Sequence, residues 1–561
     1  MFLSEGQSEV GRKKRMGKKR RKQRERKQQE QRRQRAIANV MSKVVPRSSF
    51  DRPYQKLLKL IRRHNVLSIV TQASLKLHEM ERMEDDDKRV QAWGQTPPWL
   101  LMLLIRWAFE HGDPSTLDKP SLNYREFVKA VNLLHDMNGA EDPFLKEGGV
   151  AGLQKFLRTL AFQQFWYSAK LSQSDLGRQG VLFRRLPEEH WIQRKFRELT
   201  KLSISEFLEI AFILWASLDG KLSPQVSAKL FDNYSPNKGK LFFDLVSLAP
   251  SQVSEYLKDK NRKNAVRLPF LQMKELTPLT RYPLLRLPQF YWVYSRRVFE
   301  QALTTFIYDV LKAEDSARFG SEFGPLFEAY VRRGLEWLGT KFYDERDLAR
   351  HLGGKTVDFL LPYDHCTVLI EVKATEIKGP VQVNPANEQL MNELKSTVIK
   401  ATVQGMSVAT TLNQGNDPLD VPARTLYYLL IVTYREHYLG SGMDLWSEFL
   451  EEAVTPALEK QGITAVIVPP ERIAILSATE FDHLISLLSS GAVDLPMLLA
   501  SVAASDRTDN LAIRKFSFGQ HLHEHPGERP SLPYLYEEVE ALADSVAEKV
   551  RARAQEVNGG G

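Results

Sequence analysis

Up to about residue 310, apolar residues recur mainly at helical spacing. Ser203 and Glu206 have the spacing of a capping box, in which each side chain bonds the backbone N–H of the other residue. They precede the run FLEIAFILWASLDG, which is apolar nearly all round. A helix without a polar face must be buried. We therefore predict a large, mainly α-helical domain over residues 46–310.

The pattern changes near residue 311, where strand-like and helical segments begin to alternate. Such alternation indicates an α/β unit built around a mixed sheet with flanking helices. We predict this unit over residues 311–490, followed by a helical C-terminal segment over residues 491–561. The predicted elements of the unit are a helix in SEFGPLFEAYVRRGLEWLG, two strands in KTVDFLLPYDHCTVLIEVKAT (355–375), a helix from Glu388 to about Ala409, a strand in TLYYLLIVTY (425–434), a helix in WSEFLEEAVTPALEKQG, one or two strands in ITAVIVPPERIAILSA and a helix in EFDHLISLL.

The first 45 residues lack apolar periodicity and are strongly basic. Residues 1–40 contain fifteen Lys and Arg against four Glu, a balance of +11, whereas the whole chain carries +9, so the remainder is close to −2. Residues 1–45 bury too little apolar surface to fold alone, so we predict a disordered arm that grips phosphates. A targeting or ribosome-adhering tail, or a solubility segment, fits the same composition. The arm's candidate nucleic-acid contacts are Arg12, Lys13, Lys14, Arg15, Lys18, Lys19, Arg20, Arg21 and Lys22.

Length and composition narrow the class of protein. A chain of 561 residues with 43% hydrophobic residues can form several buried cores, which excludes a wholly disordered protein. Its single cysteine, Cys366, excludes an internal disulfide and a cysteine-rich zinc site. The N-terminal region has no apolar segment like that of a signal peptide. The longest uncharged apolar stretch near the N-terminus, from Pro97 to Ile105, is about half a membrane span, so we expect no transmembrane helix. We expect a cytoplasmic protein.

Two acids and a lysine interrupt the apolar runs of residues 355–375. Side chains alternate along a strand, so Glu371 and Lys373 share one face while Val372 points to the other. A hairpin turning at PYDH would bring Asp358 beside them from the neighbouring strand. Carboxylate oxygens are preferred ligands of Mg²⁺, which also keeps several waters. Asp358, Glu371 and the carbonyl of Val372 would bind Mg²⁺, or Mn²⁺ in its place, and Lys373 would orient or deprotonate a water for phosphodiester cleavage.

Glu-x-Lys alone is a weak signal, because chance produces it repeatedly in a chain with this many charges. Glu376 and Lys378 have the same spacing a few residues later. The neighbouring residues favour Glu371 and Lys373 as the catalytic pair. Glu371 directly follows the apolar run CTVLI, whereas Glu376 is followed closely by Gly379 and Pro380. The alternative is a solvated sheet end or a simple Glu-Lys ion pair.

The same residues resemble a known catalytic core. VDFLL, with twelve residues between its Asp and the EVK, on a hairpin after a helix with an embedded Glu, resembles the PD-(D/E)XK nuclease superfamily over about residues 311–485. Val357 stands where the superfamily has proline. In that superfamily an acid of the preceding helix often joins the metal site, and the resemblance assigns this part to Glu328. It also implies that Lys400 and Gln404, four apart on the helix KATVQGMSVA, face the site.

The resemblance implies a restriction-endonuclease-like α/β core and a Mg²⁺-dependent nuclease that cuts DNA, in prokaryotic DNA processing or defence against foreign DNA. The helical domain would then select the substrate or a protein partner. One alternative is a catalytically silent, nuclease-like module that binds nucleic acid or protein. Another is a membrane-surface or ribosome-associated factor that works through the arm alone. No motif separates DNA from RNA, endonuclease from exonuclease, or monomer from oligomer, and no Walker-type loop predicts ATP use.

Overall fold

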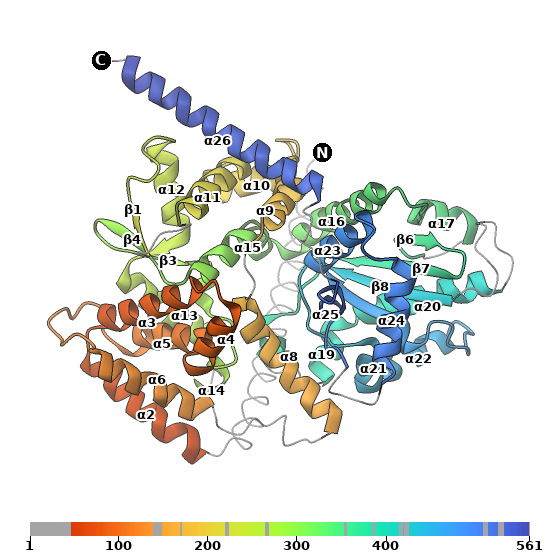
Figure 1. Cartoon of the computed structure of the whole chain (residues 1–561), viewed down its shortest axis with the longest axis horizontal. Helices are drawn as coiled ribbons and strands as arrows, with labels where there is room; N and C mark the ends of the chain where they lie inside the picture. The colour runs from red at the N-terminus through yellow and green to blue at the C-terminus, as the bar shows by residue number, and fades with distance from the viewer. Residues whose placement is uncertain are drawn as a thin grey trace, which may run out of the picture. The chain divides into compact units, whose positions relative to one another are not determined.

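The computed structural model describes residues 47–138, 149–168, 171–218, 224–263, 269–352, 356–383, 387–414, 419, 426–508, 514–525 and 532–559. The predicted basic arm over residues 1–45 lies outside them. The described part of the chain is mostly helical and contains two small mixed sheets (Figure 1). None of the described helices combines the length and the apolar character needed to cross a membrane.

The chain divides into two compact units, each built from more than one segment. The first comprises Met1–Ala73, Leu100–Glu147 and Pro250–Lys274, and the second comprises the remainder. A buried polar network holds the first unit together: the Trp107 indole donates to Gln272 Oε1 at 2.5 Å, and Arg106 pairs with Glu110 at 2.6 Å. The first unit contains α2 (Arg47–Arg63), the first half of α3 (Val66–Glu81), nearly all of α5 (Pro98–His111), α6 (Tyr124–Asn138), α13 (Pro250–Lys263) and α14 (Pro269–Gln272).

The N-terminal part of the second unit combines helices with a small four-stranded sheet. The sheet has the order β1-β4-β3-β2, and only the β2–β3 pair is parallel. The strands are β1 (Gln225–Ser227), β2 (Ser247–Leu248), β3 (Leu284–Arg286) and β4 (Phe290–Val293). The helices are α4 (Asp86–Gln95), α8 (Gly149–Ser168), α9 (Gln173–Gln179), the π-helical turn η1 (Gly180–Arg184), α10 (Trp191–Thr200), α11 (Ile204–Leu218), α12 (Pro236–Val246), the 3₁₀ turn η2 (Pro278–Arg281) and α15 (Arg296–Glu314).

The predicted capping box before α11 is confirmed. The Ser203 backbone N–H donates to Glu206 at 2.8 Å, and the Glu206 N–H donates to Ser203 Oγ at 3.2 Å. The helix it starts is largely buried, as its apolar sequence predicts. The four-stranded sheet was not predicted, because strands of two to four residues are too short to show alternation.

The C-terminal part of the second unit surrounds a five-stranded mixed sheet. Its order is β5-β6-β7-β8-β9; β5, β6 and β7 are antiparallel, while β7, β8 and β9 are parallel. The β6–β7 hairpin turns at the predicted place, since Pro362 pairs with Thr367 and the Tyr363 N–H donates to the Cys366 carbonyl. The strands are β5 (Tyr343–Asp344), β6 (Phe359–Pro362), β7 (Cys366–Lys373), β8 (Leu426–Thr433) and β9 (Ile473–Ser477).

Helices cover both faces of this sheet. Phe359 and Ile370 belong to the core that includes residues of α16 (Ser316–Leu338), whereas Leu360 and Leu369 belong to the core that includes residues of α20 (Val398–Asn413). Helix α20 lies close to the sheet, because a Cβ on Gly405 would come within 2.7 Å of Leu429. The two faces therefore place different helices beside the ends of β6 and β7.

The single helix predicted from Glu388 to Ala409 is two helices, α19 (Asn387–Leu394) and α20. Thr397 lies at the break, and its hydroxyl donates to the Leu394 carbonyl at 3.2 Å. A threonine that bonds nearby backbone in this way competes with continued helix formation.

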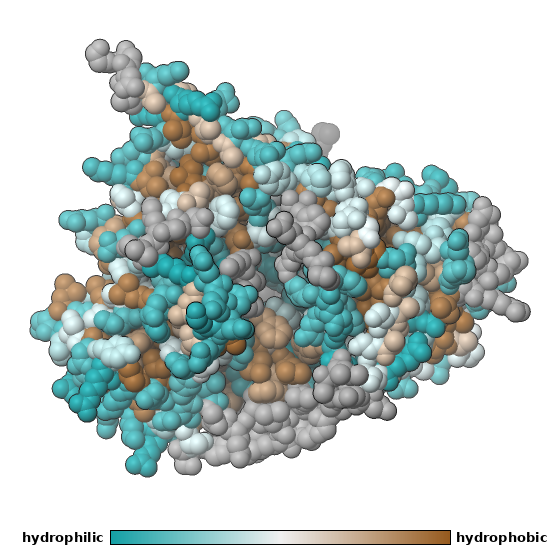
Figure 2. All heavy atoms as spheres, viewed as in Figure 1, coloured by the Kyte–Doolittle hydropathy of each residue, from teal (hydrophilic) through white to brown (hydrophobic). Residues whose placement is uncertain are grey.

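Further helices complete the second unit. In Figure 2, teal hydrophilic residues cover much of the face in view and brown apolar residues appear between them, as expected for a chain that buries its cores. The predicted helical C-terminal segment includes α26, which packs on α11, with Lys549 and Glu209 2.6 Å apart. The helices are α17 (Glu345–Leu352), α18 (Gly379–Val383), α21 (Gly442–Leu445), the π-helical turn η3 (Trp446–Leu450), α22 (Glu451–Glu459), the 3₁₀ turn η4 (Pro470–Arg472), α23 (Ala478–Ser489), α24 (Leu495–Asp506), α25 (Phe518–Leu522) and α26 (Pro533–Gly559).

Candidate functional site

The candidate site lies where β6 begins and β7 ends. Because the two strands are antiparallel, the start of one meets the end of the other. Asp358 lies in a bend directly before β6, one residue outside the strand, and its Oδ2 accepts the Val372 N–H at 2.5 Å. The Lys373 ammonium contacts Glu371 Oε1. The structure thus brings the three predicted side chains together.

The alternation of β7 also separates the side chains as predicted. Val372 packs against the core on the α16 side of the sheet, whereas Glu371 and Lys373 contact each other on the α20 side. The N–H and C=O of a strand residue point toward the same neighbouring strand. Since the Val372 N–H reaches Asp358, the Val372 carbonyl is also directed toward β6.

Glu371 is a buried acid whose charge is only partly balanced. Glu371 is only 2% exposed, and its Oε2 has no hydrogen-bond partner among the described residues. Burial raises the pKa of Glu371 to about 7, and the charge of Asp358 adds to this effect against the opposing charges of Lys373 and Lys400. Burial likewise raises the pKa of Asp358, against the Val372 N–H and the Lys373 charge. The two carboxylates repel each other in a poorly solvated place.

Glu328 approaches the same site from α16. It is half-buried, and burial followed by the charges of Asp358 and Glu345 raises its pKa. The other acids of the helix are placed differently, because Glu322 lies 3.6 Å from Arg318 and Glu336 is exposed. Among the acids of α16, Glu328 is therefore the one whose pKa is raised by the charge of Asp358.

Glu345 is a further acid near the site, which the sequence reasoning missed. It is the first residue of α17 and directly follows β5, whose Asp344 pairs with Phe359 of β6. Asp358 precedes Phe359, so the register places Glu345 next to it, and the Glu345 charge contributes to raising the pKa of Asp358. The available sequence signal was the helix cap, in which the Asp347 N–H donates to Asp344 at 2.9 Å.

Lys400 and Gln404 lie on α20, as the resemblance implies. The Gln404 amide donates to the Thr356 carbonyl at 3.0 Å, which ties α20 to the segment that leads into β6. Lys400 is exposed, and its charge lowers the pKa of both Asp358 and Glu371. The face of α20 that carries these two residues therefore borders the site.

The donor set fits a hydrated cation with few protein ligands. No three His, Cys, Asp or Glu side chains of the described residues converge closely enough to hold a metal, so Glu328 does not join Asp358 and Glu371 in a three-acid cluster. Mg²⁺ is ordinarily held by one or two carboxylates, with waters and phosphate oxygens completing its shell. The repulsion between the Glu371 and Asp358 carboxylates suits such an ion, which these two residues and the Val372 carbonyl would hold.

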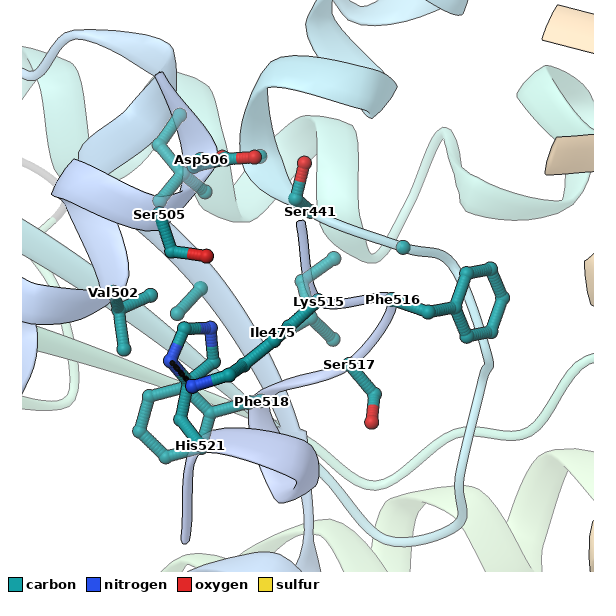
Figure 3. Close-up of a pocket in the computed structure, with 14 residues that line it drawn as sticks. Ser441, Ile475, Val502, Ser505, Asp506, Lys515, Phe516, Ser517, Phe518 and His521 are labelled. Carbon is teal, nitrogen blue, oxygen red and sulfur yellow. Dashed lines mark hydrogen bonds between the residues drawn. The ribbon is translucent and has the colours of Figure 1, made fainter. Parts of the chain in front are cut away.

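A separate pocket lies beside β9 and contains none of the predicted catalytic residues. Figure 3 shows Lys515 donating to the ring of His521, at a distance of 3.4 Å from Nδ1. Burial, aided by the Lys515 charge, lowers the pKa of His521 to about 4, so this imidazole is neutral. Arg514 pairs with Asp506 at 3.0 Å. The pocket's charges are thus paired within the protein. Its labelled lining is Ser441, Ile475, Val502, Ser505, Asp506, Lys515, Phe516, Ser517, Phe518 and His521.

Comparison with protein-family models, with curated proteins and with solved structures found no match to this chain. The functional interpretation therefore depends on the residues of the site and on the arrangement of the elements that carry them.

Proposed function

We propose that the protein is a Mg²⁺-dependent nuclease whose site is formed by Asp358, Glu371 and Lys373. The observation that carries the proposal is the buried Glu371, which keeps one oxygen without a partner beside a second carboxylate and a lysine. A strongly raised pKa on a buried acid at the end of a strand, as on Glu371, favours a functional site over a structural ion pair. The succession of a helix (α16), the β6–β7 hairpin, a helix (α20) and a further strand (β8), with β5, α17, α18 and α19 between them, supports the resemblance to the PD-(D/E)XK core.

The residues suggest how the reaction would proceed. A bound divalent cation would stabilise charge on the phosphodiester and lower the pKa of a water. Glu371 holds the Lys373 ammonium in place, so that it can orient the attacking water and balance the developing negative charge. The water oxygen forms a bond to phosphorus while the bond from phosphorus to the leaving oxygen breaks. The water's proton passes to solvent, and the leaving oxygen takes a proton from solvent.

The test is cleavage of linear DNA, circular DNA and RNA in Mg²⁺, Mn²⁺ or EDTA. We expect cutting with either cation and none in EDTA. Asp358→Asn preserves an acceptor for the Val372 N–H, and Lys373→Met preserves the length of the side chain, yet both should abolish cutting. Lys378→Met is the matched control from the second Glu-x-Lys and should cut normally. Cleavage that survives both site substitutions would exclude this site.

A catalytically silent binding module is the second candidate. It is favoured by the close Lys373–Glu371 pair and by the lack of a three-acid cluster among the described residues. A silent module should bind nucleic acid equally well with and without divalent cation and should be indifferent to Lys373→Met. Cation-dependent cutting by the unmodified protein would reject it.

The basic arm offers an independent test of how nucleic acid is held. Deleting residues 1–40 removes fifteen cationic side chains. Because each phosphate contact releases counterions, binding should become weaker and less sensitive to salt, while cutting of bound substrate persists. Complete loss of every activity on deletion would instead support a factor that works through its arm alone.

A further inference from the structure

Three buried oxygen atoms next to the site lack hydrogen-bond partners among the described residues. They are Thr356 Oγ1, Gln404 Oε1 and Glu371 Oε2. Thr356 is only 3% exposed, and Glu371 is 2% exposed. Leaving a buried polar group unsatisfied destabilises a protein, so such atoms are rare in folded proteins. Three of them around one site call for a common explanation.

Contacts connect the residues that carry these atoms. The Gln404 amide nitrogen donates to the Thr356 carbonyl at 3.0 Å, which fixes which end of the amide carries the free oxygen. Helix α20 packs on β7, and Lys400, one turn before Gln404, acts on the pKa of Glu371. Gln404 thus lies on the helix that packs on the strand of Glu371, and Thr356 lies two residues before Asp358.

The chemistry of the three oxygens identifies what they would bind. The carboxylate and the amide oxygen are acceptors, and the threonine hydroxyl both donates and accepts. Together they suit a small molecule that donates two hydrogen bonds and accepts one. A water does this, and buried waters ordinarily make about three such bonds.

We propose that Thr356 and Gln404, with Glu371, hold the water that attacks the phosphodiester, so that Thr356 is a further catalytic residue. This inference depends on the proposed nuclease function. The bound water supplies the oxygen that bonds to phosphorus, the bond to the leaving oxygen breaks, and solvent receives one proton and returns one. Lys373 contacts Glu371 and balances the negative charge that develops on the phosphate.

The experiment compares Thr356→Val, which removes the hydroxyl but keeps the shape, with Thr356→Ser, which keeps the hydroxyl. We expect Thr356→Val to lower kcat about 10- to 100-fold with little change in KM, and Thr356→Ser to restore most of it. Gln404→Met tests the same water from α20 if Thr356→Val does not fold. Thr402→Val is the matched control and should cut normally, because the Thr402 hydroxyl is buried but donates to the Val398 carbonyl at 2.9 Å.

A crystal structure that resolves waters gives a readout independent of cleavage. The unmodified protein should show a water on Thr356 Oγ1 and Gln404 Oε1, and Thr356→Val should lack it. Normal cutting by Thr356→Val, or no water at this place, would overturn the inference and leave the nuclease proposal standing. A protein that shows the water but cuts no substrate would overturn the nuclease proposal and with it the role given to the water.

Discussion

Two Glu-x-Lys pairs, Glu371/Lys373 and Glu376/Lys378, lie five residues apart, and the charges of their glutamates are balanced to different extents. Lys373 is the one close cation of Glu371 among the described residues, and one Glu371 oxygen has no hydrogen-bond partner there. The pKa of Glu371 is raised to about 7, and burial is the largest cause. Glu376 lies 2.6 Å from Lys312 and also contacts Arg435. Burial acts to raise its pKa, but the charges of Arg435 and Lys312 outweigh burial and lower it.

The lysines of the two pairs also differ in burial and in their partners. Lys373 is mostly buried at the end of β7, whereas Lys378 is exposed and pairs with Glu393 at 2.8 Å across the α18–α19 region. The second pair is therefore a set of structural ion pairs whose charges cancel. The first leaves negative charge unbalanced, which is the condition that a cation or a reacting group can satisfy. The two pairs have the same spacing in the sequence, but only the balance of charges around each glutamate distinguishes the candidate site from the structural ion pairs.

The largest expected difference is in cleavage. Glu371→Gln should lower cation-dependent cutting at least about 100-fold, because it removes a charge that acts at the reacting phosphate. Glu376→Gln has the same chemistry and should retain near-normal cutting per folded molecule. Initial rates at saturating substrate, corrected for the folded fraction by circular dichroism, measure both. Equal losses in the two variants would contradict the assignment.

Stability should respond in the reverse order. Glu376→Gln leaves the partly exposed Lys312 and Arg435 without their shared anion and should lower the free energy of unfolding by about 1–3 kcal/mol. Glu371→Gln removes a buried, repelled carboxylate and should be neutral or stabilising above pH 7. Urea unfolding in EDTA measures both changes. A more stable Glu376→Gln than Glu371→Gln would show that the balance of charges has been misread.

The pH dependence should also have opposite signs. Glu371 has a folded pKa of about 7 against an ordinary value of 4.5, so between these values the folded state holds a proton that the unfolded chain has lost. Its contribution to stability is full below about 4.5 and is lost as pH rises through 7, by on the order of 1–3 kcal/mol.

The lowered pKa of Glu376 gives the reverse slope. Its contribution is present above its ordinary value of 4.5 and is lost as pH falls through the folded pKa. Stability should therefore rise for Glu371→Gln relative to the unmodified protein from pH 4.5 to 7, and the deficit of Glu376→Gln should shrink below 4.5. Unfolding curves at several pH values, without divalent cations, show whether the two variants diverge in this way.

The smallest effect should come from Lys378→Ala. Its ion pair with Glu393 is solvent-exposed, and such pairs contribute between 0 and about 1 kcal/mol. We expect a change in unfolding free energy within about 0.5 kcal/mol, which added salt should reduce further. A larger loss would mean that the ion pair between Lys378 and Glu393 stabilises the protein more than its exposure indicates.

Local patterns in the sequence were sufficient for the hairpin that carries the site. Two apolar runs separated by PYDH specify β6 and β7, and strand alternation separates Val372 from Glu371 and Lys373. The pattern placed Asp358 within the first strand, whereas the structure places it one residue before β6. The difference arises because the Asp358 carboxylate, rather than a backbone carbonyl, accepts the Val372 N–H.

Features that depend on packing between distant segments could not be read from local patterns. Thr356 and Gln404 are 48 residues apart and meet only because α20 packs on the sheet. Glu345 comes beside Asp358 through the β5–β6 register, and β5 is only two residues long. The helix cap at Asp344 marks the start of α17, but it does not distinguish Glu345 from an ordinary surface acid.

The bond from Val372 to Asp358 has a consequence for how activity could be lost. The Asp358 side chain accepts a backbone N–H at the open end of the hairpin, so it stabilises the pairing of the two strands in addition to its proposed role in catalysis. A variant that abandoned catalysis would still need an oxygen at this position to keep its two strands joined. Asparagine would meet that need and alanine would not, so an inactive but intact decoy of this protein should be made with asparagine at residue 358.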